Sequence, residues 1–246
     1  MNEPIWGEVT HGAVFIADSH ENEKNRLLER LWSTLESEES SAPIFLMGDI
    51  FDLLFGGIKA SFKPHETLLA RISRLAKRRV IYWFEGNHDF NLGGRVPNVK
   101  IIPRNAQPAL FRIGDEYAWL AHGDFGLGIR YEIYTKIIRN RALLWLLNAL
   151  DWCLQGRVFA LVNKKISAKN LRWGMDAKKL AKERLPKYQT GKAKWIFEGH
   201  FHSVGAIEAS EGVYVALPCL ACNEKYFVVE FSSGVVLLAD RRVYST

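Results

Sequence analysis

The sequence is poor in cysteine, with 3 cysteines in 246 residues. A small secreted domain held together by disulfides needs many more, so that class is excluded and a reducing compartment is expected. Cys219 and Cys222 form a C-x-x-C pair, but they follow Pro218 at the end of an expected strand rather than opening a helix. We interpret them as packing cysteines, with a redox or zinc role as the alternative.

Long apolar runs are also absent. No stretch reaches the ~18 apolar residues that a membrane-spanning helix needs, so we expect no spanning helix. Residues 1–4 show neither the basic region nor the apolar region of a signal peptide, so none is expected. An apolar content of 48% supports a sizeable core and argues against disorder. The length of 246 residues suits one large domain, or one domain with an inserted subdomain.

Acidic residues are scarce in one segment. Residues 126–194 hold 16 Lys and Arg against 4 Asp and Glu, a net charge of +12, whereas the rest of the chain carries −6. We therefore expect a core formed by residues 1–125 and 195–246, into which a basic helical insert at 126–194 has been set. The insert predicts an anionic partner, and the alternative is a solvated helical surface.

The sequence contains one pattern five times: an apolar run that ends in Asp, Asn or His, with glycine nearby. In the second example, Ile44–Met47 runs into Gly48 and Asp49. Each run predicts a buried strand that delivers a polar side chain at its carboxyl end. The other four runs end at residues 18–20, 85–89, 122–124 and 198–202. Because ligands of open α/β sheets lie outside the carboxyl ends of the strands, we expect these side chains to share one site.

Helical and strand patterns alternate in the first half of the chain. Residues 25–37 and 65–79 predict helices, which indicates βαβ units and a mostly parallel sheet. A second sheet with hairpin character is predicted at residues 99–102, 109–113 and 117–121. Four more short strands are predicted at residues 206–209, 213–217, 227–231 and 235–239.

The insert is expected to be helical over residues 126–190. Its segment Ala142–Leu154 is apolar nearly all round, and basic residues precede and follow it. Such a helix can lie in a membrane interface. The alternative is a helix buried within the insert.

The five strand ends offer carboxylate, imidazole and amide oxygen ligands, and no thiolate. These donors suit Mn²⁺, Fe or Zn²⁺ rather than a structural cysteine-zinc site. Two cations about 3.5–4 Å apart need an anionic bridge, which one carboxylate can supply.

The same five blocks resemble those of the calcineurin-like metallophosphoesterases, in the same order, over residues 18 to 202. The blocks are Asp18-x-His20, Gly48-Asp49-x-x-Asp52, Gly86-Asn87-His88-Asp89, His122-Gly123-Asp124 and Gly199-His200-x-His202. The resemblance implies an α/β fold, a four-layer α/β/β/α sandwich, in which a helical insert caps a dinuclear metal site between two sheets. It implies a hydrolase that uses two divalent ions, Mn²⁺ in the first place and Fe or Zn²⁺ as alternatives.

The resemblance also implies roles for single residues. The first metal would be held by Asp18, His20 and His202, the second by Asn87, His122 and His200, and Asp49 would bridge them. A hydroxide shared by the metals would attack phosphorus in line. His88 would stabilise the phosphoryl charge or protonate the leaving oxygen. Asp52 and Asp89 would orient ligands from behind.

Within this family, the chain is most similar to the UDP-2,3-diacylglucosamine hydrolases of lipid A synthesis. Three features carry this resemblance: the total length, the pair Asp89-Phe90 after the third block, and the basic helical insert. Those enzymes cleave the pyrophosphate of UDP-2,3-diacylglucosamine to UMP and 2,3-diacylglucosamine 1-phosphate. The resemblance implies a cytoplasmic protein, peripheral on the inner membrane, with an anionic membrane surface and not nucleic acid as its partner. The candidate contacts to nucleotide and sugar phosphate are Asn163, Lys165, Lys169, Asn170 and Arg172, for which solvated helix surface is the alternative.

Two other functions stay open. A soluble phosphodiesterase or nucleotide pyrophosphatase of the same fold would use the basic insert for phosphate contacts to a nucleotide or nucleic acid. A non-catalytic scaffold would bind a partner protein through the insert, although a scaffold need not keep all seven ligands and His88.

Overall fold

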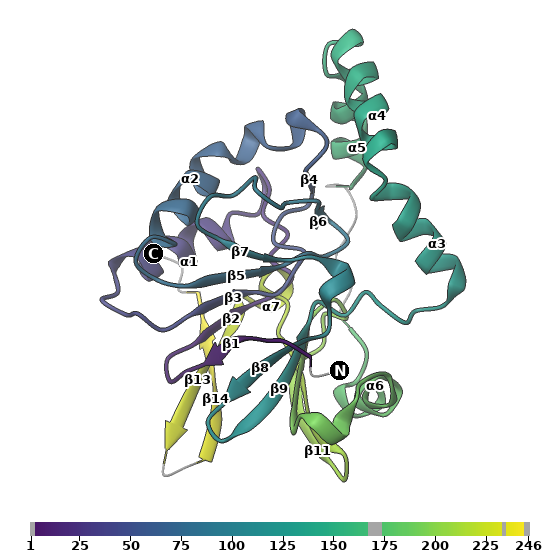
Figure 1. Ribbon diagram of the computed structural model, residues 1–246. Helices are drawn as coiled ribbons and strands as arrows, with labels where there is room; N and C mark the ends of the chain where they lie inside the picture. The colour runs from purple at the N-terminus through teal and green to yellow at the C-terminus, as the bar shows by residue number, and fades with distance from the viewer. Residues whose placement is uncertain (1–2, 167–173, 233–234, 244–246) are drawn as a thin grey trace.

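Two six-stranded sheets pack against each other in the computed structural model, which describes residues 3–166, 174–232 and 235–243 (Figure 1). The first sheet has the order β14 (Val235–Arg242), β13 (Lys225–Ser232), β2 (Val14–Ile16), β3 (Ile44–Leu46), β5 (Ile81–Phe84) and β7 (Lys100–Ile102). The second has the order β1 (Ile5–Val9), β8 (Ala109–Ile113), β9 (Glu116–Ala121), β10 (Trp195–Glu198), β12 (Gly212–Ala216) and β11 (Gly205–Ala209). A two-stranded ribbon is formed by β4 (Leu54–Phe55) and β6 (Asp89–Phe90).

Helices cover the outer faces of both sheets. The first sheet is covered by α1 (Leu27–Ser37) and α2 (Glu66–Leu75), and the second by α6 (Ala177–Arg184). A short helix, α7 (Leu220–Asn223), lies between β12 and β13 in the chain. Three further helices project away from the sheets, namely α3 (Ile129–Ile138), α4 (Arg141–Cys153) and α5 (Arg157–Ile166) (Figure 1). Short 3₁₀ turns lie at Lys59–Ser61, Lys63–His65, Arg104–Ala106, Leu185–Lys187 and Thr190–Lys192. The α/β/β/α sandwich is thereby confirmed.

The main core lies between the two sheets. Phe15 of β2 stacks on Phe45 of β3 with ring centroids 4.6 Å apart, and on Phe197 of the second sheet at 4.8 Å. The neighbours of these residues in β2 and β3 point to the other face of the sheet, since side chains alternate along a strand. There they pack against α1 and α2. Burial on both faces explains why these strands appear in the sequence as continuous apolar runs.

The part of the basic segment that contains α6 packs on the second sheet. Leu180 and Ala181 of α6 are buried against Trp119 of β9 and Ile196 of β10. The helices α3, α4 and α5 stand apart from this layer (Figure 1).

Two strand assignments in the six-stranded sheets differ from the predictions. The strand at residues 99–102 was expected in the second sheet, but β7 pairs in parallel with β5 at the edge of the first. The strand β7 joins the first sheet because its side chains pack on both faces of that sheet. Ile101 packs in the apolar cluster between this sheet and the helices α1 and α2, and Ile102 packs in the core between the two sheets. The strand β1 was not predicted. It is the edge strand of the second sheet, parallel to β8, and mixes polar and apolar residues.

The helix predicted at residues 65–79 is shorter than expected, since α2 ends at Leu75. Beyond it, the buried guanidinium of Arg79 donates to the carbonyl of Ala42 and lies 3.3 Å from the carboxylate of Glu38. Between the end of α2 and β5, the amides of Arg78 and Arg79 both donate to the carbonyl of Leu75, so the chain forms a turn there instead of a further helical turn. Among the described residues, no helix is long and apolar enough to cross a bilayer.

Candidate metal centre

The loops after β2, β3, β5, β9 and β10 meet at one edge of the sandwich and bring together two clusters of possible metal ligands. In the first cluster, the ligand atoms of Asp18, His20 and His202 lie within 4.8 Å of one another. In the second cluster, Asp49, His122 and His200 meet the same distance limit. The structure therefore brings six of the seven expected ligands together in two groups, each of which could hold a metal ion.

Asn87, the seventh expected ligand, lies beside the second cluster. Its Oδ1 atom is 3.4 Å from Nε2 of His122, which in turn is 3.5 Å from Oδ1 of Asp49. The two clusters are joined through the backbone, because the amide of His200 donates to the carboxylate of Asp18 at 2.9 Å. All seven residues thus surround one polar region.

Backbone strain is concentrated in this region. Five of the expected ligands have a positive φ angle: 49° at Asp18, 44° at His20, 51° at Asp49, 67° at His200 and 50° at His202. A left-handed conformation costs a residue other than glycine about 1–3 kcal/mol and persists only where the surroundings impose it. Such strain is typical of functional sites, and here it directs side chains from several strand ends toward each other.

Two glycines of the motifs are required by close approaches. At Gly86, a Cβ atom would lie 2.3 Å from Oδ1 of Asp49. At Gly48, which has a φ of 89°, a Cβ atom would lie 2.4 Å from Nδ1 of His122. Any larger residue would displace an expected ligand.

Two of the histidines are oriented by acceptors behind them. Nδ1 of His122 donates to the carbonyl of Met47 at 2.9 Å, which leaves Nε2 directed toward Asp49. Nδ1 of His20 lies 3.1 Å from Oδ1 of Asp52, while its Nε2 is buried and has no hydrogen-bond partner among the described residues. A buried imidazole nitrogen without a partner is costly unless it binds something. The residues present therefore fit a cation, and Asp52 occupies the orienting position that supports a metal-bound imidazole.

Asp89 holds together the two loops that carry Asp49 and Asn87. Its carboxylate accepts hydrogen bonds from four donors: the backbone amides of Asp49, Ile50 and Gly86 and the indole of Trp83. Asp89 is completely buried. The carboxylate of Asp89 therefore fixes the backbone of the loops that carry Asp49 and Asn87 relative to each other.

The electrostatics of the region favour added positive charge. Burial raises the pKa of Asp18 to about 6, with His122 opposing and Asp49 reinforcing this shift. Burial alone would lower the pKa of His122, but the carboxylates of Asp49 and Asp18 raise it to about 10. Burial, and then the positive charge of His122, lower the pKa of His200 to about 3. The negative charge of these carboxylates is what stabilises a proton on the buried imidazole. Divalent cations would neutralise the same negative charge.

His88 lies next to the expected ligands. Its backbone amide donates to Oδ1 of Asp49 at 2.8 Å, and its Nδ1 donates to the carbonyl of Asp52 at 2.8 Å. The ring meets that of His20 edge-on, with centroids 5.1 Å apart. The hydrogen bond to Asp52 leaves Nε2 of His88 as the nitrogen that can act on a substrate.

Arg139, which follows α3, was not identified from the sequence. Its guanidinium donates to the carbonyl of Gly86 at 2.8 Å and lies 3.3 Å from the carboxylate of Asp124 and 3.5 Å from that of Glu85. It thus fastens the insert to the loop that carries Asn87. The role of Arg139 could not be predicted, because it is one basic residue in a basic segment and its acidic partners, Glu85 and Asp124, are distant in the chain.

Tyr131 of α3 was also missed. Its hydroxyl is buried and has no hydrogen-bond partner within the part of the chain that the structure describes, and its ring centroid is 6.4 Å from that of His200. Burial and the nearby Asp124 raise the pKa of this phenol. The insert therefore brings a neutral hydroxyl donor to the rim of the metal centre.

The predicted substrate contacts fall partly within the described structure. Asn163 and Lys165 are on α5, where Asn163 is half-buried and Lys165 is exposed. Lys169, Asn170 and Arg172 lie outside the described residues. A substrate role for these five residues stays a prediction.

The prediction for the C-x-x-C pair was wrong. The chain turns into α7 directly after Cys219, so that the pair opens a short helix and the two Cα atoms lie 5.3 Å apart. The structure joins Cys219 and Cys222 in a disulfide, whereas Cys153 is free and exposed.

The chain belongs to the calcineurin-like phosphoesterase family, whose sequence model matches residues 13–204. It is therefore a metal-dependent phosphoesterase, and the fold implies divalent metal ions, for which the two His and Asp clusters are the candidate ligands. The chain is 27% identical over 138 residues to the UDP-2,3-diacylglucosamine hydrolase of Aeromonas salmonicida (strain A449). The aligned part covers 54% of this chain and 54% of that protein, so the chain spans about half the length of this curated relative.

The solved structures to which the chain shows similarity have little sequence identity to it. A Vps29 variant from Entamoeba histolytica is 11% identical with a TM-score of 0.43, covering 94% of this chain and 98% of its own. A conserved protein from Streptococcus pneumoniae TIGR4, described as a predicted phosphoesterase, is 12% identical with a TM-score of 0.39, covering 94% of this chain and 98% of its own.

Proposed function

We propose that this phosphoesterase cleaves the pyrophosphate of UDP-2,3-diacylglucosamine, or of a closely similar acylated UDP-sugar, to give UMP and the acylated sugar 1-phosphate. The observation that carries the proposal is an apolar surface on α3, α4 and α5, next to the metal centre. The partial similarity to the hydrolase of Aeromonas salmonicida supports the same substrate class.

This apolar surface, called the insert surface below, is formed by large side chains that are exposed. They are Ile129, Ile133, Ile137, Trp145, Leu146, Leu150, Trp152, Leu154, Leu161 and Val162. Trp145 is 70% and Trp152 is 82% exposed. Only Leu144 and Asp151 of α4 are buried, so α4 is not the buried helix that was the alternative. An apolar surface of this extent is typical of a site that receives lipid or another apolar partner.

The insert surface is linked to the metal centre and surrounded by positive charge. Besides Arg139, Asn148 of α4 fixes the insert by accepting a hydrogen bond from the backbone amide of Lys59 at 3.0 Å. Exposed basic side chains flank the apolar residues at Arg130, Arg141, Arg157, Lys164 and Lys165. Apolar and basic groups together suit acyl chains and anionic headgroups, so we propose that the protein binds the membrane surface peripherally.

In this proposal, the seven expected ligands, Asp18, His20, Asp49, Asn87, His122, His200 and His202, would hold two divalent cations, with Mn²⁺ favoured by the donor types, and Asp49 would be the ligand that both could use. When bound, such cations neutralise phosphoryl oxygens and make a water nucleophilic near neutral pH. Asp52 and Met47 keep the reactive nitrogens of His20 and His122 directed into the site. His88 presents Nε2 to the phosphoryl group, where it stabilises developing negative charge or protonates the leaving oxygen.

The decisive experiment incubates purified protein with Mn²⁺ and UDP-2,3-diacylglucosamine and measures UMP. UDP-N-acetylglucosamine, which lacks the two long acyl chains, is the matched soluble substrate. We expect UMP from the diacylated substrate at a rate well above that from the soluble one. If no UMP forms while a dinucleotide or cyclic nucleotide is hydrolysed rapidly, the protein is instead a soluble phosphodiesterase.

A further inference from the structure

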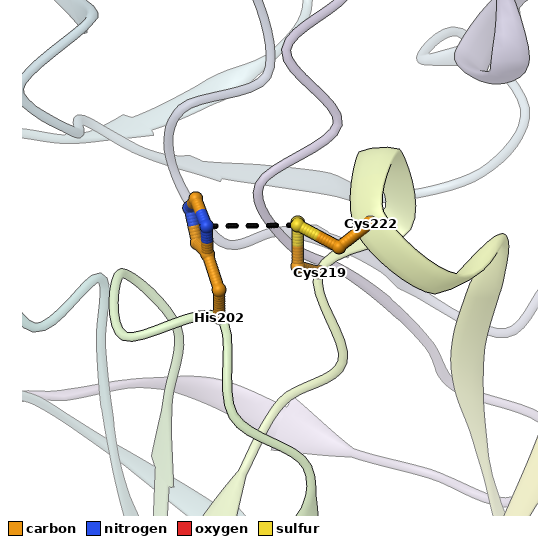
Figure 2. Close-up of side chains that lie close together, drawn as sticks. All are labelled: His202, Cys219 and Cys222. Carbon is orange, nitrogen blue, oxygen red and sulfur yellow. Dashed lines mark hydrogen bonds between the residues drawn. A yellow bond between two sulfur atoms is a disulfide. The ribbon is translucent and has the colours of Figure 1, made fainter. Parts of the chain in front are cut away.

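His202 faces two different sets of possible ligands. Its Nε2 lies 3.6 Å from Oδ1 of Asp18, on the side of the hydrolytic metal centre. Its Nδ1 lies 3.6 Å from Sγ of Cys222, on the opposite edge of the ring. Figure 2 shows the imidazole directed at the sulfur pair of Cys219 and Cys222. The ligand atoms of these three residues lie within 4.8 Å of one another.

We propose that Cys219, Cys222 and His202 form a second, thiophilic metal site when the cysteines are reduced, and that the disulfide closes it. Two cysteines separated by two residues have the spacing that zinc sites use, and the imidazole supplies a third ligand. Three protein ligands leave a fourth position of a tetrahedral ion for water. The site would take Zn²⁺, Cd²⁺ or Co²⁺ in preference to Mn²⁺, because thiolates favour softer ions.

The positions of the two sulfurs allow this change. Cys219 is completely buried, and its Sγ lies 3.4 Å from the carbonyl of Asp18, whereas Cys222 is partly exposed. A thiolate of an external dithiol can therefore attack Sγ of Cys222. The S–S bond breaks, and its electron pair goes to Sγ of Cys219, which takes up a proton. The second thiol of the reagent then closes its own disulfide and releases Cys222, so that two electrons and two protons reach the pair.

Reduction also gives the sulfurs the separation that a metal needs. Unbonded sulfur atoms move apart to van der Waals contact, and two sulfurs bound to a tetrahedral zinc at the usual bond length are roughly 3.7 Å apart. Metal binding then releases the two thiol protons. The partly exposed Cys222 is the residue that can move, since Cys219 is enclosed by the core.

The second site would compete with the hydrolytic one, a consequence that depends on the proposed function. A neutral imidazole has one nitrogen that accepts and one that carries hydrogen. A metal at Nδ1 of His202 therefore leaves Nε2 protonated and unable to bind the ion near Asp18. The disulfide removes the competing thiolates and keeps His202 available to the hydrolytic centre.

Cobalt binding tests the sulfur site directly. Protein reduced with dithiothreitol and desalted without oxygen should bind Co²⁺ with an intense thiolate-to-cobalt charge-transfer band in the near ultraviolet. Oxidised protein and Cys222→Ser should show no such band, whereas Cys153→Ser, which removes the exposed free cysteine, should keep it. Thiol titration and circular dichroism confirm the redox state and the fold. Absence of the band from fully reduced protein, or its persistence in Cys222→Ser, would overturn the proposal.

Competition is measured with Mn²⁺ binding followed by electron paramagnetic resonance. One equivalent of Cd²⁺ should weaken Mn²⁺ binding roughly tenfold more in reduced protein than in oxidised protein or Cys222→Ser, in which Cd²⁺ competes only by binding the hydrolytic centre itself. The two proposals fail separately. A charge-transfer band without any phosphoester hydrolysis would refute only the proposed function, and hydrolysis without the band would refute only the thiophilic site.

Discussion

Oδ1 of Asp52 lies 3.1 Å from Nδ1 of His20, and the other nitrogen of that ring is buried with no hydrogen-bond partner in residues 3–166, 174–232 and 235–243. The carboxylate is itself held by the side-chain amide of Asn22 at 2.6 Å. Asp52 therefore fixes both the orientation of His20 and the nitrogen that is left for a metal.

Asp52→Asn should weaken metal binding without unfolding the protein. The amide has the same shape but is a weaker acceptor for the imidazole hydrogen, so we expect the Mn²⁺ affinity to fall roughly 10- to 100-fold. Calorimetric titration with Mn²⁺ measures this loss. Asp115→Asn, in the exposed turn between β8 and β9, is the control and should leave the affinity unchanged. Equal affinities for both variants would contradict the role assigned to Asp52.

Asp49→Asn should abolish hydrolysis while the fold is retained. This carboxylate is the expected bridge between two cations, so its neutralisation removes the anion that offsets their repulsion. We expect activity on a chromogenic phosphodiester to fall by a factor of roughly a thousand or more. Circular dichroism and urea unfolding check the fold. Full retained activity would refute the dinuclear assignment.

The sandwich could be predicted because its signals are local. Each buried strand, such as Ile44–Leu46, is an apolar run that ends in a turn and a polar side chain, and the order of these blocks is visible in the sequence. The strand β7 was misplaced because its partner is chosen by tertiary packing of Ile101 and Ile102. A short strand of three residues carries no signal for the sheet it joins.

The meeting of these polar side chains at the strand ends could likewise be predicted, but the contacts that support them could not. Arg139 reaches Gly86 across 53 positions, and Cys222 reaches His202 only after the chain has formed two further strands. Each of these contacts depends on where separate loops arrive in space. The residue type alone favours a surface role for an arginine and a packing role for a cysteine.

Removing the tryptophans of the insert surface should weaken binding to anionic vesicles. Trp145 and Trp152 expose apolar rings that can enter a lipid interface, so we expect the partition coefficient of each Trp→Ser variant to fall roughly tenfold. Co-sedimentation with vesicles of defined anionic content measures this change. Tyr117→Ser, an exposed aromatic residue on β9, is the matched control. Indifference of the wild-type protein to salt and lipid charge would contradict peripheral binding.

Glu198 is the centre of a buried network that fastens α6 to the second sheet. It lies 2.7 Å from the guanidinium of Arg184 and accepts hydrogen bonds from the hydroxyls of Tyr188 and Tyr214. Glu198→Gln leaves the buried cation of Arg184 without a counter-charge, so the free energy of unfolding should fall by about 3–5 kcal/mol. Urea unfolding measures the loss.

The matched control for Glu198 is an exposed ion pair on the same sheet. Glu116 lies 3.6 Å from the ammonium of Lys194, and both side chains are about half exposed. Glu116→Gln should change the free energy of unfolding by less than about 1 kcal/mol. A similar effect of both substitutions would show that burial does not strengthen the Glu198 network.

His65 should make the stability of the protein depend on pH. Burial lowers its pKa to about 4, although Asp52 opposes the shift, and its ring packs on that of Phe51 with centroids 4.4 Å apart. Between pH 4 and pH 6.5 the unfolded chain binds a proton at this residue that the folded chain does not. The folded state therefore loses stability as the pH falls from about 6.5 to 4, by at most about 3 kcal/mol.

His65→Phe keeps an aromatic ring on Phe51 and removes the titrating group. Its free energy of unfolding should rise relative to that of the wild type as the pH falls from about 6.5 to 4, and the difference should be constant above this window. Urea unfolding at a series of pH values measures the difference. A chelator is present so that metal binding does not contribute to the free energy of unfolding. Parallel pH profiles for the two proteins would show that His65 is protonated equally in the folded and unfolded states.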